Sequence, residues 1–334
     1  MNQPIFIEIN RTCDKDCYYC YNKKKTSKPT RPDINRILLS VIKLSQRKRN
    51  IRLVFSGGEP TKNLNDITLL IEKLRTRRYR PKITIITNID KISEEFKRFI
   101  RVYNPSIVLS FNNASIENIK TIRRIKTRAQ IFVRFTLSPN NINSIVRYII
   151  ILLQQKIQIG LSPAYGIDWD TKSLNKLSDI YFFLSNHQNY NLIHDFDNPP
   201  MRRICESLSQ PNAIDINGNI HPCHRAIYLK RDIQKSKFTN MCFICPAYQY
   251  CVPCIYKDIP GEGCKIRVAI SPTYAILYER RKKAMKKKAK ITHKGKKYEI
   301  PEAVIKQYIK DKKNTGSSRK NNRNFYELGE SDCY

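Results

Sequence analysis

Three cysteines near the amino terminus have the spacing of ligands to one metal centre. Cys13, Cys17 and Cys20 are separated by three and by two residues, and they directly follow a β-branched run that is typical of a strand. Three thiolates so close together can bind three irons of a 4Fe–4S cluster and leave the fourth iron open to a substrate or cofactor. A structural zinc site is the alternative, although it would need a fourth ligand and no histidine is near in the sequence.

A second group of cysteines follows after a gap of 184 residues. It comprises Cys205, Cys223, Cys242, Cys245, Cys251, Cys254 and Cys264. Seven thiols exceed what one 4Fe–4S cluster needs, so this group predicts a separate metal site. The CxxC pairs are also a hallmark of zinc ribbons, but only five residues separate the two pairs here. His221 and His224 flank Cys223 and are alternative ligands, whereas Cys333 is expected to be unligated.

The elements expected to position the first cysteines alternate between strands and amphipathic helices. β-Branched runs predict strands at 4–9, 51–55, 82–87, 106–111, 131–136 and 157–162. Apolar residues at helical spacing predict helices at 33–46, 64–76, 92–101, 115–127 and 142–155. This alternation is typical of a parallel α/β architecture, either curved as part of a barrel or laid out as an open sheet, and we expect a partial (β/α)6 barrel followed by a small cysteine-rich domain. In both forms ligands bind at the carboxyl ends of the strands.

Composition divides the rest of the chain. A polar stretch that includes Asn198-Pro199-Pro200 predicts a connecting segment at 166–204, between a first domain at 1–165 and a cysteine-rich domain at 205–265. Residues 266–334 form a basic extension, in which 280–323 contain 18 Lys+Arg against three acidic residues. We expect this extension to be partly flexible.

The composition also limits the class of protein. A chain of 334 residues with 41% hydrophobic residues can bury a sizeable core. No apolar run reaches the length of about 18 residues that a membrane span requires, and the amino terminus lacks a signal pattern, so we expect a cytoplasmic protein with no membrane partner. A reducing compartment disfavours disulfides, which makes metal ligation the leading use of the 11 cysteines.

The first cysteine segment resembles a known family. CxxxCxxC with Tyr19 before the last cysteine, on the loop after the first strand, is similar to the cluster-binding motif of radical S-adenosylmethionine (radical SAM) enzymes. Ser56-Gly57-Gly58-Glu59-Pro60 resembles the GGEP segment of the same family. The resemblance implies that Cys13, Cys17 and Cys20 hold one 4Fe–4S cluster beside bound S-adenosylmethionine (SAM). It further implies SAM contacts from Tyr19, Gly57, Gly58, Glu59, Pro60, Thr87, Asn88, Ser110, Asn112 and Arg134.

The same resemblance assigns parts of the cofactor to these residues. The backbone and the acid of the GGEP segment would hold the amino group of SAM, while Thr87, Asn88 and Ser110 would contact its ribose and methionine parts. Arg134 would pair with its carboxylate, a geometry that a guanidinium suits. Family members commonly have Asp at the position of Asn112.

The second cysteine group resembles the SPASM extension that follows many radical SAM domains and holds two auxiliary 4Fe–4S clusters. By this resemblance Cys242, Cys245, Cys251 and Cys264 would ligate the distal cluster. Cys205, Cys223 and Cys254 would hold the cluster nearer the active site and leave one of its irons open. This chain has two residues between Cys251 and Cys254, where three are usual.

The resemblance implies an enzyme that reductively cleaves SAM to a 5'-deoxyadenosyl radical and abstracts hydrogen from a substrate, most commonly a peptide or protein. It implies an external electron donor, flavodoxin-like or ferredoxin-like. Because only three residues precede the first predicted strand, leader-peptide recognition is expected from a separate protein or from the basic extension. Two alternatives stay open: a nucleic-acid-binding protein with structural iron–sulfur or zinc centres, and a radical SAM enzyme acting on nucleic acid or a small metabolite.

The net charge of +34 has two interpretations. A strongly basic surface attracts polyanions, so nucleic acid is a candidate partner of the basic extension. Codon bias in an AT-rich genome is the alternative, because Lys, Ile, Asn and Tyr are abundant throughout the chain.

Overall fold

The computed structural model describes most of residues 4–185, residues 211–228 except 225, and residues 266, 269 and 270. The gaps within 4–185 are 21, 23–25, 27, 29, 47, 89–91, 112–119, 121–123, 125–129 and 165–166. Several predictions therefore lie outside the described residues: most of the helix at 115–127, Asn112, and every cysteine of the second group except Cys223. The basic stretch at 280–323 lies outside them as well.

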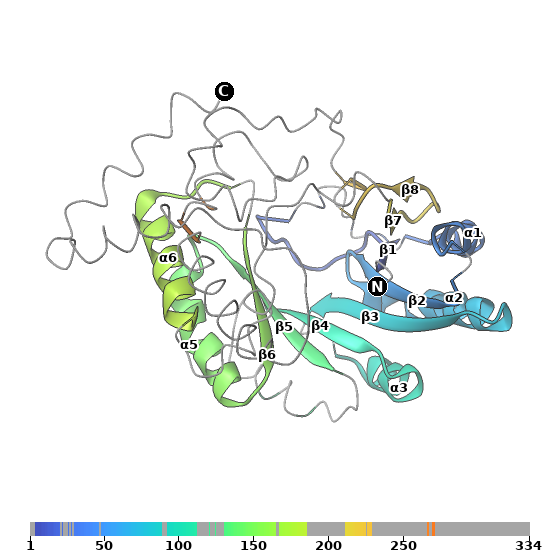
Figure 1. The fold of residues 1–334 in the computed structure, drawn as a ribbon, viewed down its shortest axis with the longest axis horizontal. Coiled ribbons are helices and arrows are strands. Elements are labelled where there is room, and N and C mark those ends of the chain that lie inside the picture. The colour runs from blue at the N-terminus through green and yellow to red at the C-terminus, as the bar shows by residue number, and fades with distance from the viewer. Residues whose placement is uncertain are drawn as a thin grey trace, which may run out of the picture.

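Eight strands form one sheet. They are β1 (Ile5–Asn10), β2 (Asn50–Gly57), β3 (Arg80–Asn88), β4 (Ser106–Phe111), β5 (Ile131–Leu137), β6 (Gln158–Pro163), β7 (Ala213–Ile214) and β8 (Ile220–His221). Their order is β6-β5-β4-β3-β2-β1-β7-β8, and every pair is parallel except β7–β8. The first six strands therefore lie side by side in chain order, as a curved sheet (Figure 1). The predicted α/β architecture with a parallel sheet is confirmed, and each of the six predicted strands is present within two residues.

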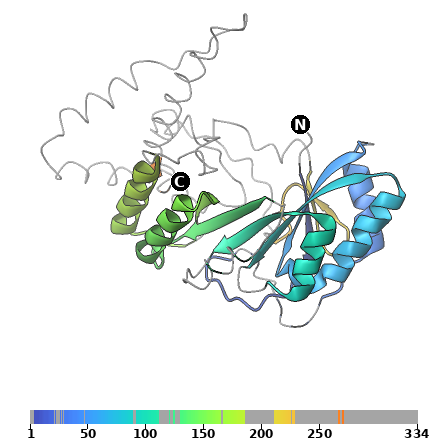
Figure 2. The same cartoon turned by 90° about the horizontal axis from the view of Figure 1, so that it is seen from below.

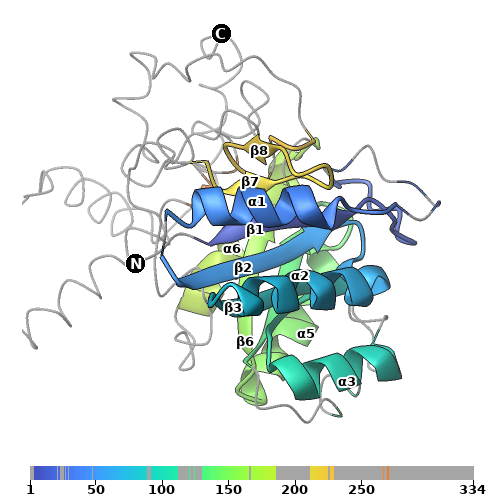
Figure 3. The same cartoon turned by 90° about the vertical axis from the view of Figure 1, so that its right-hand side faces the viewer.

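Helices connect these strands. They are α1 (Ile34–Leu44), the short 3-10 helix η1 (Pro60–Asn63), α2 (Leu64–Thr76), α3 (Glu94–Tyr103), α5 (Ile142–Gln154) and α6 (Thr171–Ser185). Figure 2 shows them wrapped around one side of the sheet, and Figure 3 shows α1 and α2 lying over β1, β2 and β3. No helix in the described part of the chain is long and apolar enough to cross a bilayer.

The core lies between the helices and one face of the sheet. Alternation along each strand directs one set of side chains into it, as with Leu53 and Phe55 of β2, which are fully buried. Helix ends agree with the sequence: Ser93 caps α3 by accepting the N–H of Phe96 at 3.1 Å, and Asn104 ends that helix in the left-handed conformation.

Helix α6 was not predicted, because its Lys, Asn and Ser residues gave the 166–204 stretch a polar composition. Its apolar residues nevertheless recur at helical spacing, and Leu174, Leu177 and Tyr181 are buried in the main core. Asp170 precedes the helix and accepts the N–H of Ser173 at 2.7 Å, the geometry of an N-cap. The main core therefore continues past residue 165.

Candidate functional site

The loop that carries the first three cysteines begins at the carboxyl end of β1. Its return segment pairs with its start, since the N–H of Thr26 donates to the carbonyl of Arg11 at 3.0 Å. A turn joins two of the cysteines, with the N–H of Cys20 donating to the carbonyl of Cys17 at 2.9 Å. The structure thus places Cys13, Cys17 and Cys20 on one closed loop at the predicted edge of the sheet.

The donor set on this loop suits iron. All three thiols are partly exposed and none is in a disulfide. Within the described ranges, no three His, Cys, Asp or Glu side chains gather closely enough to hold one metal ion. Three accessible thiols on one loop fit the iron–sulfur chemistry expected of the motif, because each would bind a different iron of a cluster.

The two glycines at the end of β2, Gly57 and Gly58, lie against the residues that precede Cys13. The N–H of Gly58 donates to the carbonyl of Asn10 at 2.9 Å, and that of Glu59 to the carbonyl of Thr12 at 2.7 Å. A Cβ at Gly57 would come within 2.3 Å of the Asn10 carbonyl oxygen, and one at Gly58 within 2.2 Å of the Thr12 carbonyl oxygen. Gly57 also has φ +132°, which disfavours any side chain. Glycine is therefore required here by a contact within the chain.

Glu59 uses both carboxylate oxygens inside the protein. Its side chain is almost fully buried, and Oε1 accepts the Thr87 hydroxyl at 2.5 Å and the Thr61 hydroxyl at 2.7 Å. Oε2 accepts the backbone N–H of Asn88 at 2.9 Å. Pro60, also buried, begins η1 directly after it. Glu59 therefore joins the carboxyl ends of β2 and β3.

Three predicted SAM contacts lie in one row across the sheet. Asn88 pairs in register with Ser110, and Ser110 with Arg134. Because residues in register on parallel strands point to the same face, these side chains share the face opposite the helices. Asn88 and Ser110 are half-buried and Arg134 is exposed. Thr87 lies on the other face, where it is buried against Glu59.

Tyr19 links the cysteine loop to the far part of the sheet. Burial, with a smaller contribution from Cys17, raises the pKa of its phenol, and a hydrogen bond with the side chain of Thr136 in β5 partly opposes that rise. Thr136 is two residues beyond Arg134, on the same face of the strand. The loop therefore extends from β1 to β5 at the carboxyl edge, beside the polar row.

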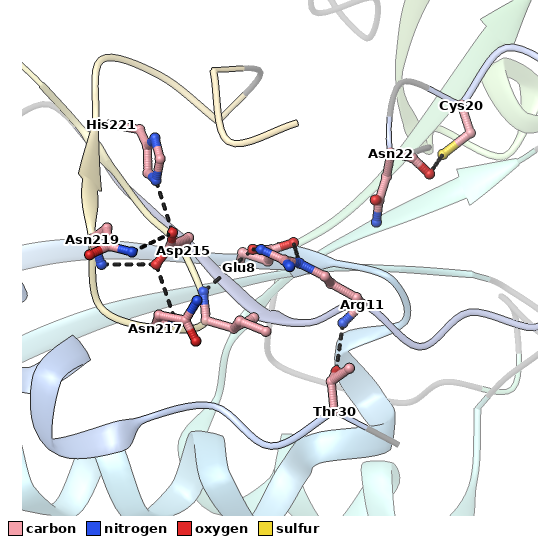
Figure 4. Close-up of polar contacts among 10 residues, drawn as sticks. Glu8, Arg11, Cys20, Asn22, Thr30, Asp215, Asn217, Asn219 and His221 are labelled. Carbon is pink, nitrogen blue, oxygen red and sulfur yellow. Dashed lines mark hydrogen bonds and ion pairs between the residues drawn. The ribbon is translucent and has the colours of Figure 1, made fainter. Parts of the chain in front are cut away.

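Sequence reasoning missed an ion pair between a buried acid of β1 and the residue that follows this strand. The Glu8 carboxylate is fully buried and accepts both Nε and Nη2 of Arg11, at 3.0 and 3.1 Å. The hydrogen bond to Glu8 raises the pKa of Arg11. Figure 4 shows Glu8 between Arg11 and the β7–β8 hairpin, whose Ile216 N–H reaches Oε2 of Glu8 at 3.4 Å. A charged residue inside an otherwise apolar strand was the available signal.

The β7–β8 hairpin is built around Asp215. Its carboxylate accepts the backbone N–H groups of Asn217 and Asn219 at 3.0 and 2.8 Å, and it contacts Nε2 of His221 at 3.0 Å. Burial opposes ionisation of Asp215, but the hydrogen bonds from Asn219 and His221 outweigh it and lower its pKa.

The same hairpin is fixed to the first part of the chain. β7 pairs with β1, and the Ser40 hydroxyl of α1 donates to the Gly218 carbonyl at 2.6 Å. His224 lies against the ring of Phe6, with centroids 4.8 Å apart. Cys223, which is buried two residues after β8, is therefore held next to the sheet that carries the Cys13 loop.

Comparison with known proteins agrees with this arrangement. A model of the radical SAM superfamily matches residues 7–152. The radical SAM cyclopropyl synthase TigE of Paramaledivibacter caminithermalis is 22% identical over 130 residues, which cover 33% of this chain and 27% of that protein. The chain thus spans about a quarter of the length of this curated relative.

Solved structures extend the similarity of fold. Native anSMEcpe with bound AdoMet and Kp18Cys peptide has a TM-score of 0.61 at 14% identity, covering 84% of this chain and 99% of that one. Native anSMEcpe with bound AdoMet has a TM-score of 0.58 at 12% identity, covering 86% and 100%.

Proposed function

We propose that this chain, in which residues 7–152 form a radical SAM superfamily domain, is an enzyme that binds SAM and a 4Fe–4S cluster and abstracts hydrogen from a substrate. The supporting observation is that the Gly57–Glu59 segment binds the residues that lead from β1 into the Cys13–Cys20 loop, through backbone hydrogen bonds of 2.9 Å to Asn10 and 2.7 Å to Thr12. Bound there, the reduced cluster would supply the electron that breaks a carbon–sulfur bond of SAM, giving methionine and a 5'-deoxyadenosyl radical.

The protein's own residues bind and orient. Cys13, Cys17 and Cys20 would each hold one iron, leaving one iron accessible. Arg134 would pair with the carboxylate of SAM, because a planar guanidinium presents two N–H groups to a carboxylate. Asn88 and Ser110, beside it in register, would contact the ribose and methionine parts, together with Asn112.

We assign Glu59 a positioning role, in which it binds neighbouring residues and not the cofactor itself. Since its oxygens accept four side-chain or backbone donors from Thr61, Thr87 and Asn88, its part is to fix the end of β3. Backbone groups of Gly57 and Gly58 remain the candidates for the amino group of SAM.

A peptide or protein is the proposed substrate class. Support comes from the similar fold of anSMEcpe, which was solved with a bound peptide. We further propose a SPASM-like unit at 205–265 with two auxiliary clusters, held by Cys242, Cys245, Cys251 and Cys264, and by Cys205, Cys223 and Cys254. The attachment of the Cys223 hairpin to β1 supports a fixed position of the second cluster relative to the first. A flavodoxin-like or ferredoxin-like donor would supply electrons.

Iron content and SAM cleavage test the chemistry. The protein is purified without oxygen, reconstituted with iron and sulfide, and incubated with dithionite and SAM. We expect about twelve irons per chain, from three clusters of four, and formation of 5'-deoxyadenosine. The Cys13→Ala/Cys17→Ala/Cys20→Ala variant should retain about eight irons and form no 5'-deoxyadenosine. Cys333→Ala is the matched control and should behave as the unsubstituted protein. Bound zinc with no iron and no cleavage would contradict an enzyme of this class.

Deuterium transfer tests the substrate class. Small proteins encoded beside the gene are prepared with deuterated side chains and incubated with the reduced enzyme. Deuterium should appear in 5'-deoxyadenosine when the correct peptide is present. Transfer from a deuterated nucleic acid or small metabolite, but from no peptide, would assign the enzyme to one of those substrate classes instead.

A further inference from the structure

The fold brings two basic turns together at the amino ends of β2 and β3. One turn leads from α1 into β2 and the other from α2 into β3, and these strands are neighbours, with Arg52 in register with Lys82. We call the resulting surface the basic edge. It consists of Arg49, Arg52, Arg77, Arg78, Arg80 and Lys82, all of which are exposed.

The two turns are fastened to each other. The N–H of Arg80 donates to the carbonyl of Arg49 at 2.7 Å, and Nη1 of Arg49 donates to the carbonyl of Arg77 at 2.7 Å. The Arg49 guanidinium also stacks over the buried ring of Tyr79, 4.9 Å from its centroid. The backbone that carries these cations is therefore fixed before any partner binds, so little backbone conformational entropy would be lost on binding a partner.

Arg49 and Arg77 also bond within the chain, but among the described residues the side chains of Arg52, Arg80 and Lys82 have no such use in the fold. Arg52 and Lys82 lie side by side on one face of the sheet, an arrangement of like charges that destabilises a strand pair. In the part of the chain that the structure describes, neither of them, nor Arg80, forms an ion pair. The helix dipole favours Lys73 and Arg75 in the last turn of α2, but it gives no such support to cations within strands.

The basic edge lies far from the proposed catalytic site. Arg80 and Asn88 are the first and last residues of β3, so the basic edge and the polar row are separated by about 25 Å at roughly 3.3 Å per residue. A partner bound at the basic edge does not touch the reacting groups. The basic edge therefore has a role other than holding the SAM carboxylate.

The chemistry of the basic edge favours a phosphate backbone. Five of its six cations are arginines, whose guanidinium groups bind phosphate through two parallel hydrogen bonds. The large hydrophobic side chains exposed among the described residues are Tyr18, Leu39, Leu69, Val102, Phe182 and Phe183. None belongs to the basic edge, whereas protein interfaces depend on aromatic or apolar anchors and single strands on aromatic stacking. Duplex phosphates require neither.

We propose that the basic edge binds the phosphate backbone of double-stranded nucleic acid without regard to sequence. The full-length protein is titrated into a fluorescently labelled DNA duplex, and the dissociation constant is measured by anisotropy at several salt concentrations. The test variant is Arg52→Gln/Arg80→Gln/Lys82→Gln. The control variant, Arg98→Gln/Arg101→Gln/Lys172→Gln, removes the same charge from exposed positions on α3 and α6.

The two variants separate a defined site from general attraction to a basic protein. The logarithm of the association constant falls linearly with the logarithm of the salt concentration. If all three substituted residues contact phosphates, this slope should be less steep by about 2.7 in the test variant, at about 0.9 per contact. The control should change this slope by less than about 0.5. Equal changes in both variants would overturn the proposal, as would no change in either. Displacement of the duplex by polyglutamate of equal charge and concentration would assign the basic edge to an acidic protein instead.

Discussion

The carboxylate of Glu59 accepts the backbone N–H of Asn88 at 2.9 Å, so a residue that follows β2 holds the last residue of β3. The same carboxylate accepts the hydroxyl of Thr87 at 2.5 Å. Asn88 begins the polar row that continues through Ser110 to Arg134. One buried acid thus connects the glycine segment beside the cysteine loop to the row of proposed SAM contacts.

Substitutions of Glu59 should show whether its carboxylate positions Thr87 and Asn88 or binds SAM directly. Glu59→Ala removes the acceptor of the Asn88 N–H and leaves the Thr87 hydroxyl only its longer 3.4 Å bond to the Asn88 carbonyl. This loss should cost about 1–3 kcal/mol of unfolding free energy and weaken SAM binding with it. Glu59→Gln keeps an oxygen for the Asn88 N–H, so most of the stability and binding should remain. Denaturant unfolding and anaerobic equilibrium dialysis measure the two quantities.

An exposed acid provides the control for Glu59. Glu95→Gln removes a carboxylate from the surface of α3 and should alter neither the unfolding free energy nor the affinity for SAM. If Glu59→Gln unfolds like the unsubstituted protein but loses SAM binding at least tenfold, the carboxylate contacts SAM itself and the positioning role is wrong.

The glycines should differ in their tolerance of a methyl group. Gly58→Ala would place Cβ 2.2 Å from a backbone oxygen of Thr12, which must move, and such overpacking costs about 1–3 kcal/mol or more. Gly160→Ala would meet the end of the Phe132 ring at 2.5 Å, and that side chain can shift more easily than a backbone.

We therefore expect Gly58→Ala to lower the melting temperature and to release iron from the reconstituted protein faster, while Gly160→Ala affects iron release little. Iron release into a chelator, followed by absorbance, is the measurement. Equal iron release from the two variants would contradict a specific contact between the glycine segment and the cysteine loop.

Much of the fold is predictable because the local signals are strong. The six parallel strands are continuous β-branched runs, and α2 was predicted with its observed bounds. β7 was not predictable, since two residues carry no periodicity and its pairing with β1 joins positions about 200 apart in the sequence. Glu8 and Asp215 were missed although their main partners, Arg11 and Asn219, are only three and four residues away, because those partners lie outside the regular strand pattern.

The candidate site was predictable as motifs and strand ends but not as contacts. The spacing of the cysteines and the glycines marked the correct edge of the sheet. The pattern did not reveal that the glycines face the backbone of Asn10 and Thr12, nor that Glu59 binds Thr87 and Asn88. Such relationships arise from the register of neighbouring strands.

Arg134 should recognise the carboxylate of SAM. It is exposed on the open face of β5, so Arg134→Ala should leave the unfolding free energy nearly unchanged. Loss of a charged hydrogen-bond pair should weaken SAM binding by about tenfold or more. Decarboxylated SAM should bind the variant and the unsubstituted protein equally, and Arg147→Ala is a control on α5. Equal weakening of both ligands would show that Arg134 acts elsewhere on SAM.

Tyr19 and Thr136 should behave as a coupled pair, because the loop reaches β5 through their hydrogen bond. Tyr19→Phe and Thr136→Val should each destabilise the protein by about 0.5–1.5 kcal/mol. The double variant should lower the unfolding free energy by less than the sum of the two single variants, because the first substitution has already broken the hydrogen bond. Urea unfolding of all four proteins gives the coupling energy. Strict additivity would mean that the cysteine loop is not held to β5 through this pair.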